Sequence, residues 1–154
     1  MTSLVLNNKE IMKILNEAEE LMHLVIKIPG LPQPYASVRQ GPHGWYDPKA
    51  KTKEAIQWYL RSIYSGPPTK RPVQIGFSFE FPVPKTWAKA KKKLAEKNEI
   101  EHKRKPDLDN LIKMYLDCLK KIVIYDDAQV IKFFPAPAKK FNNEPQTIIT
   151  ITEL

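Results

Sequence analysis

The sequence predicts an α+β fold: a single domain in which helices cover one face of a mixed β-sheet. Apolar and polar residues alternate strictly from Val73 to Phe81, the pattern of a strand with one buried face. Threonine and isoleucine, which favour strands, dominate residues 146–152. Other stretches repeat apolar residues every three to four positions, as helices do. The 154 residues suffice for one domain with a real core.

The chain opens with a predicted helix over residues 9–23. Its apolar residues have helical spacing, and Asn7 or Asn8 can cap its first turn. The apolar stripe consists of Ile11, Ile14, Leu15, Ala18, Leu21 and Met22. Three roles are open for this helix: it pads the fold, extends a dimer interface or holds a partner.

A strand is predicted over residues 24–28, and Pro29 and Gly30 end it. Residues 30–48 predict a long loop with basic and aromatic side chains, which are Tyr35, Arg39, His43, Trp45 and Tyr46. Side chains of these kinds contact phosphates and stack on bases in nucleic-acid complexes. Aromatic side chains also commonly pack a loop onto a core, so both interpretations stay open for Trp45 and Tyr46.

Asp47 and Pro48 are a helix start signal, an N-terminal cap followed by proline at the first helical position. The predicted helix runs to Tyr64, and its inner face is apolar. Its outer side is predicted to be basic, with Lys49, Lys51, Lys53 and Arg61. The strand over residues 73–81 follows this helix.

Residues 85–105 are strongly basic, and a charged helix is predicted from Trp87 to Lys97. A run of charge is usually only a solvated face. This run leads directly into an acidic cluster, which would repel phosphate unless positive charge surrounded it. We therefore expect the basic run to contact DNA.

The segment Lys105-Pro-Asp-Leu-Asp-Asn-Leu-Ile-Lys113 combines a helix start with acidic residues. Pro106 disfavours helix at the residue before it, and helical spacing begins immediately after it. Asp107 is thus a candidate N-terminal cap, and Asp109 lies in the first turn, where the helix dipole favours anions. Lys113 is four residues beyond Asp109 and therefore shares its face.

A second acidic pair follows this helix. Ile122 to Tyr125 predicts a short buried strand, and Asp126 and Asp127 come at its end. A helix start and a strand end that are close in sequence can bring three or four carboxylates to one point. Like charges raise one another's pKa, and a hard divalent cation such as Mg²⁺ relieves the repulsion.

Each part of this constellation also has a purely structural interpretation. Asp107 then caps a helix, and the Asp126-Asp127 pair is a solvated turn. Asp109 and Lys113 then form a surface ion pair of little energetic weight. The combination favours a functional site, because no ordinary turn needs all of these residues at this spacing.

The C-terminal part of the chain predicts two more strands, over residues 130–134 and 146–152. A basic turn over residues 135–144, with Lys139 and Lys140, is predicted to join them. The alternation of strands and helices along the whole chain is what favours a mixed sheet.

The net charge of +8 and the isoelectric point near 9.5 favour a polyanionic partner, either nucleic acid or an anionic membrane. A membrane-surface role is the weaker alternative, because the basic run lacks a matching apolar face. There is no apolar run of transmembrane length, no signal-peptide pattern and no second cysteine to pair with Cys118. We expect an intracellular, cytoplasmic protein that does not bind membranes.

The sequence resembles the RusA family of Holliday junction resolvases, which are phage and bacterial endodeoxyribonucleases. The residues that carry the resemblance are Lys105-Pro106-Asp107-Leu108-Asp109-Asn110-Leu111, Lys113, Asp117 and Asp126-Asp127-Ala128-Gln129-Val130. Weaker likeness covers most of the chain beyond the first helix. We therefore predict an N-terminal helical extension over residues 1–23 and a RusA-like endonuclease domain over residues 24–154.

The resemblance implies a Mg²⁺-dependent homodimer, with Mn²⁺ able to substitute, that resolves four-way DNA junctions by paired symmetric nicks in recombination and repair. It implies a bacterial or phage protein associated with the nucleoid. The residues expected to hold the metal are Asp107, Asp109, Asp126 and Asp127, and Lys113 would neutralise transition-state charge or position the scissile phosphate. The catalytic residues are then Asp107, Asp109, Asp127 and Lys113. The residues expected to contact DNA are Arg39, Lys91, Lys92, Lys93, His102, Lys103, Arg104, Lys105, Lys139 and Lys140.

Two other functions stay open. The first is a structure-specific nuclease that cuts flaps or other branched DNA, which only a comparison of substrates separates from a resolvase. The second is a non-catalytic DNA-binding module in which the acidic residues are caps. Metal-dependent nicking would exclude the second.

Overall fold

A mixed β-sheet forms the centre of the fold, and its strands follow the order β1-β7-β4-β5. The computed structural model describes residues 5–19 and 21–154. The strands of this sheet are β1 (His23–Pro29), β4 (Val73–Phe81), β5 (Val130–Phe133), β6 (Ala138–Phe141) and β7 (Gln146–Glu153). β7 pairs antiparallel with both β1 and β4. β5 and then β6 pair in parallel with successive halves of β4, so β4 has neighbours along both edges.

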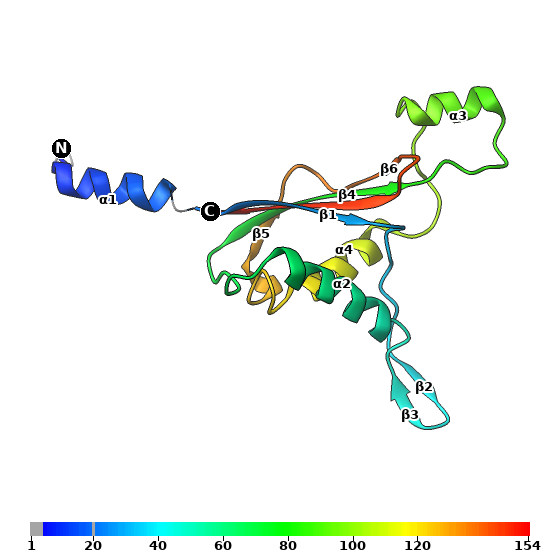
Figure 1. Cartoon of the computed structure of the whole chain (residues 1–154), viewed down its shortest axis with the longest axis horizontal. Helices are drawn as coiled ribbons and strands as arrows, with labels where there is room; N and C mark the ends of the chain where they lie inside the picture. Colours follow the sequence, from blue (N-terminus) through cyan, green and yellow to red (C-terminus); the bar gives the residue numbers. More distant parts are fainter. Residues whose placement is uncertain (1–4, 20) are drawn as a thin grey trace.

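Helices α2 (Ala50–Ile63) and α4 (Leu108–Leu119) cover one face of the sheet (Figure 1). α2 turns Ile56 and Leu60 toward the core, as its apolar spacing predicts, whereas Ile63 is 46% exposed. α4 has the larger buried face, which consists of Leu111, Met114, Tyr115, Cys118 and Leu119. The predicted α+β fold with helices over one face is therefore confirmed.

Tyr115 of α4 connects the helix layer with the sheet and with the loop after β1. Its ring lies 5.7 Å from the ring of Phe79 in β4, measured between centroids. Its hydroxyl accepts hydrogen bonds from Thr147 Oγ1 at 3.1 Å and from the backbone N–H of Gln33 at 3.0 Å. Burial raises the pKa of Tyr115 and raises that of the neighbouring Cys118 thiol to about 12, so both remain neutral core residues.

Several elements lie outside this core (Figure 1). α1 (Asn8–Glu19) extends away from the sheet, and α3 (Lys89–Glu96) lies beyond the end of β6. A hairpin of β2 (Arg39–Gly41) and β3 (Gly44–Tyr46) projects past α2. The short 3₁₀ helix η1 (Asp127–Gln129) follows α4.

The predicted N-terminal helix is present, and a capping box begins it. Asn7 Oδ1 accepts from the N–H of Glu10 at 2.9 Å, and Glu10 Oε2 accepts from the N–H of Asn7 at 3.0 Å. The helix ends at Glu19 and not at His23, which begins β1. Ile11 and Ile14 are 40% and 51% exposed, so this part of the apolar stripe does not pack on the core. The side chains of Leu15 and Ala18 lie outside the described part of the structure.

The predicted strand over residues 122–125 is wrong. Lys121 takes a φ of +67°, and the chain turns back against the end of α4, with the N–H of Val123 bonded to the carbonyl of Leu119 at 3.0 Å. The apolar side chains of residues 122–124 are buried in this turn. A short apolar run indicates burial, but it does not distinguish a strand from a buried turn.

Two predicted irregular segments contain strands. The basic turn over residues 135–144 includes β6. Its two adjacent lysines do not suggest a strand, but β6 pairs in parallel with one edge of β4. The loop over residues 30–48 includes the β2–β3 hairpin, whose turn holds Gly44 at a φ of +106°. The other predicted elements lie within a few residues of their expected places. Every helix in residues 5–19 and 21–154 is too short or too polar to cross a bilayer.

Candidate active site

The first acidic pair lies on the surface at the start of α4. Asp107 occupies the N-cap position, but its carboxylate makes no capping hydrogen bond within the described residues. Instead Lys105 Nζ donates to Asp107 Oδ1 at 2.6 Å. Asp109 Oδ1 accepts from the N–H of Asn110 at 2.9 Å. Both side chains are exposed, so their remaining oxygen lone pairs face solvent and could bind a cation.

The second acidic pair is anchored at η1. Asp126 Oδ1 accepts from the N–H of Asp127 at 2.9 Å, and Gln129 Oε1 accepts from the N–H of Asp126 at 2.7 Å. Gln129 Nε2 donates to the carbonyls of Thr69 and Arg71 at 2.7 and 2.9 Å, which ties the turn to the loop before β4. The backbone of this pair is therefore fixed from two sides.

Lys120, the residue after α4, faces this second pair. Its Nζ lies 3.9 Å from Asp126 Oδ1 and 3.6 Å from Asp127 Oδ2. A hydrogen bond with the Asp126 carboxyl and the charge of Lys120 hold the pKa of Asp127 below its ordinary value. Asp127 is therefore ionised at neutral pH, as a metal ligand must be. The sequence motif does not single out Lys120.

The two acidic pairs lie at opposite ends of α4. A helix of 12 residues is about 18 Å long. Within the described part of one chain, no three His, Cys, Asp or Glu side chains are close enough together to hold a metal ion. The expected convergence of four carboxylates therefore does not occur in a single chain. The cause is the buried turn over residues 122–124, which leaves Asp126 and Asp127 beside the end of the helix and not beside its start.

Lys113 extends over an aromatic ring and not toward Asp109. Its Nζ lies 4.0 Å from the centroid of Tyr35, a distance at which the ring face attracts the ammonium. The N–H of Tyr35 in turn bonds to the carbonyl of Asn110 at 2.9 Å. The loop after β1 is thus held against the first turn of α4, and the ammonium of Lys113 is held at the Tyr35 ring.

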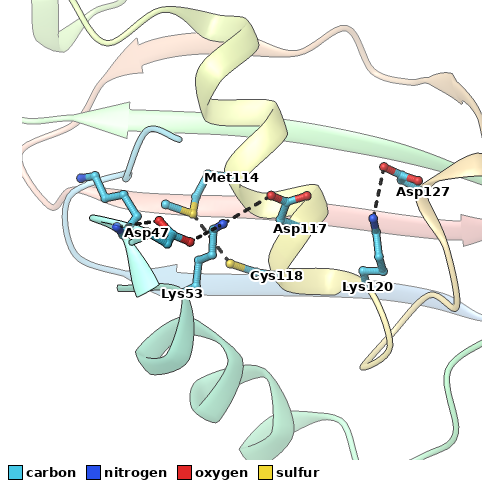
Figure 2. A network of polar contacts seen from close by, with 8 residues as sticks. Asp47, Lys53, Met114, Asp117, Cys118, Lys120 and Asp127 are labelled. Carbon is cyan, nitrogen blue, oxygen red and sulfur yellow. Dashed lines mark hydrogen bonds and ion pairs between the residues drawn. The ribbon is translucent and has the colours of Figure 1, made fainter. Parts of the chain in front are cut away.

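Lys53 of α2 bridges Asp47 and Asp117, and the latter belongs to α4 (Figure 2). Its Nζ lies 3.0 Å from Asp47 Oδ2 and 3.6 Å from Asp117 Oδ2, and its side chain is only 20% exposed. Burial alone would lower the pKa of Lys53, but the hydrogen bond with Asp47 and the charges of both carboxylates outweigh it and raise the pKa. The predicted place of Lys53 on the outer side of the helix is therefore wrong. Asp117, an acid in the last turns of α4 between apolar residues, is the sequence signal that could have predicted such a partner.

The predicted DNA-contacting side chains lie on β2, on α3, in the segment 102–105 and on β6. Arg39 is exposed on β2, and the lysines at 91–93 lie on α3. Lys91 Nζ lies 4.0 Å from the ring centroid of Trp87, and the guanidinium of Arg104 lies 5.9 Å from it. This shared ring brings α3 close to the basic segment 103–105 before α4. Their contact with DNA stays a prediction.

Lys139 has a structural role. Its Nζ donates to the carbonyl of Arg104 at 2.7 Å and to that of Pro106 at 3.1 Å. These bonds fix the segment that leads into Asp107. The expected contact of Lys139 with DNA is untested, but its ammonium already has these partners; Lys140 beside it is exposed.

His102 packs between two aromatic rings. Its ring centroid lies 4.5 Å from that of Phe81 and 4.9 Å from that of Phe141. Among the described residues its Nδ1 finds no hydrogen-bond partner. Burial, and then the charges of Lys139 and Arg104, lower the pKa of His102. His102 therefore packs against these two rings, and its expected contact with DNA stays a prediction.

The family model described as "Endodeoxyribonuclease RusA" matches residues 27–152. The chain belongs to the RusA family. The match includes both acidic pairs, Lys113 and the whole sheet except the start of β1 and the end of β7. The uncharacterized protein YqaN of Bacillus subtilis (strain 168) is 32% identical over 127 residues, which span 79% of this chain and 87% of YqaN.

RusA family enzymes are endodeoxyribonucleases that act on branched DNA and depend on a divalent metal ion. α1 lies before the matched residues, so it is an addition to the part that defines the family. The boundary between residues 23 and 24 stays a prediction.

The burial of His102 predicts a loss of stability in acid. In the unfolded chain a histidine titrates near pH 6.5, whereas the folded state lowers the pKa of His102, so the unfolded state takes up the proton first. The contribution is fully present above about pH 6.5 and is lost as the pH falls below it. Replacing His102 with Leu should reduce the difference between the urea unfolding free energies at about pH 7.5 and about pH 5.5.

The exposed His43 provides the control, since His43→Asn should leave that difference unchanged. Equal pH dependence in wild-type protein and the His102→Leu variant would show that the ring protonates freely in the folded state.

Proposed function

We propose that this protein is a Mg²⁺-dependent endodeoxyribonuclease that resolves Holliday junctions, as a homodimer, by paired symmetric nicks in DNA recombination and repair. The observation that carries the proposal is the pair of anchored, exposed acidic sites at the two ends of α4, within a chain of the RusA family. Lys113 beside the first pair and the basic segments around it provide the positive charge that a phosphodiester substrate needs.

The separation of the two acidic pairs supports a dimer. One chain offers two carboxylates at each end of a helix about 18 Å long, so the four carboxylates expected to bind the metal do not meet within the described part of one chain. A two-fold axis across the middle of α4 would bring the start of this helix in one chain to its end in the other. Each of two equivalent sites would then combine Asp107 and Asp109 of one copy with Asp126 and Asp127 of its partner.

In this arrangement the four carboxylates are the ligands for Mg²⁺, or for Mn²⁺ in its place. A divalent cation bound there would supply an activated water and stabilise the charge on the leaving oxygen. Lys113 would contact the scissile phosphate, because its ammonium is held over Tyr35 and is not paired with Asp109. Arg39, the lysines of α3 and the segment 102–105 would contact the DNA backbone.

We assign the endonuclease function to residues 24–154 and regard residues 1–23 as an extension of it. The protein would act in the bacterial or phage-infected cytoplasm, at the nucleoid. A flap nuclease on the same fold is the main alternative, since the same carboxylates would serve it. Purified protein incubated with a four-way junction, a flap and a duplex, with and without Mg²⁺, separates these functions and also tests for a non-catalytic DNA-binding module.

Replacing Asp107, Asp109 or Asp127 with Asn should each reduce junction cleavage by at least about a hundred-fold. Binding of the junction should stay equal or become tighter, because less negative charge faces the phosphates. Asp126→Asn should have a milder effect on cleavage. Its Oδ1 already accepts a hydrogen bond as the cap of η1, so this side chain is the less certain metal ligand. Single-turnover cleavage and gel-shift assays measure the two quantities separately.

Glu54, an exposed acid on α2, supplies the matched control, because Glu54→Gln changes the net charge equally. Near-normal cleavage by any of the first three variants would remove that residue from the list of metal ligands.

Mixing two inactive variants tests the shared site. In a dimer of one Asp109→Asn chain and one Asp127→Asn chain, both changes would fall in the same composite site and the other site would be intact. The mixture should therefore regain metal-dependent nicking, with cuts that are single and not paired. If each chain instead holds a complete site, the mixture will be as inactive as its components.

Binding should depend strongly on salt, because lysine contacts release counterions from DNA. Changing Lys91, Lys92 and Lys93 together to Gln should reduce the slope of log affinity against log salt by about two to three units. Lys9→Gln with Lys13→Gln on α1 is the control for a general loss of charge. A slope that falls equally in both variants would mean that α3 is only a solvated face.

A further inference from the structure

The β2–β3 hairpin, residues 39–46, forms an arm that projects from the body past α2 (Figure 1). Trp45 on it is 72% exposed and Tyr46 is 49% exposed. Tyrosine and tryptophan are enriched at interfaces, because one side chain offers both an apolar ring and a polar group. Neither of these rings packs the loop onto the core, which was the alternative left open by the sequence.

The arm is built as a two-sided ribbon. Arg39 pairs with Tyr46 and Gln40 pairs with Trp45, so the members of each pair share one face. The Tyr46 ring lies against Gly41, where an added Cβ would come within 3.0 Å of the ring. One face thus carries Arg39 beside the ring of Tyr46, and the other carries Trp45 beside Gln40.

The charge of the arm suits a polyanion. Residues 30–46 contain no Asp or Glu, and Arg39 lies among them. Asp47, which follows the arm, is paired with Lys53, and Lys49 and Lys51 come next at the start of α2. A ribbon with exposed aromatic rings, a basic residue and no acid matches the surfaces that stack on nucleobases.

Both ends of the arm are fixed to α4. On one side the N–H of Tyr35 bonds to the carbonyl of Asn110, and Lys113 lies over the Tyr35 ring. On the other side Asp47 binds Lys53, which also contacts Asp117 (Figure 2). The arm is therefore attached to the same helix that begins with Asp107 and Asp109. These contacts fix the position of the arm relative to the two acidic residues.

We propose that this arm enters the open centre of branched DNA and that Trp45 stacks there on a base exposed at the branch point. The inference rests on the proposed function, since it names the element that distinguishes a junction from a duplex. Bases inside a duplex are covered by their neighbours on both sides. At an opened branch point the terminal base pairs lose one neighbour, and an aromatic ring can replace it. The arm would then position the scissile strand relative to Lys113.

The test compares Trp45→Ala with Trp58→Ala, which removes another exposed tryptophan, on α2. Affinities for a four-way junction and for a linear duplex of the same sequence are measured without divalent metal. Trp45→Ala should weaken junction binding about ten-fold and leave duplex binding within about two-fold. Trp45→Phe should keep most of the junction affinity, and Trp58→Ala should change neither. A 2-aminopurine base at the branch point should lose its fluorescence response to protein only in Trp45→Ala.

Equal weakening of junction and duplex binding, or no weakening of either, would overturn the inference. Dissociation of the dimer in Trp45→Ala, seen by sedimentation velocity, would overturn it as well and assign the arm to the second copy of the chain. The outcome is separate from that of the proposed function. If wild-type protein cuts junctions with Mg²⁺ while Trp45→Ala binds them normally, only the role of the arm fails; if wild-type protein cuts no branched DNA, the proposed function fails.

Discussion

The packing of α4 against the sheet is the constraint on which the candidate site depends. Leu111 and Met114 are fully buried and Tyr115 nearly so, with the Tyr115 hydroxyl bonded to both Thr147 and Gln33. Protein interiors are close-packed, so this helix cannot slide or turn without opening voids and breaking those bonds. Because one acidic pair begins the helix and the other lies beside its end, the same packing sets the distance between them. The packing of the core therefore determines the separation of the two acidic pairs.

The polar contacts around α4 extend this rigidity to a segment that would otherwise move. Connecting loops are usually the most mobile part of a fold. Here Lys53 is shielded between two carboxylates, Asp47 and Asp117, where each ion pair is stronger than it would be in water. Removing the lysine would leave two partly buried acids facing each other, a costly arrangement. The C-terminal end of the loop of residues 30–48 is therefore held to α4 by this cation.

The sequence predicts the elements whose patterns are local. The alternation of residues 73–81 and the apolar spacing of α4 both arise from burial of one face. Each pattern can be recognised within its own segment of the sequence. β6 could not be predicted in this way, because its pairing with β4 is a property of the sheet edge. Likewise the sequence identifies all four acidic residues as a possible site. It does not reveal that they lie at two ends of a helix, since the turn over residues 122–124 has the composition of a strand.

The helix dipole distinguishes the two acidic pairs. Asp107 and Asp109 lie at the N-terminal end of α4, where partial positive charge favours anions. Asp126 and Asp127 lie near its C-terminal end, where the last carbonyls oppose them, and Lys120 offsets part of that effect. In the proposed dimer the two copies of α4 run antiparallel across the symmetry axis. The positive end of each helix would then face the less favourable acidic pair of the other copy. The symmetry that completes each site would therefore also reduce the electrostatic cost of gathering four carboxylates before any cation binds.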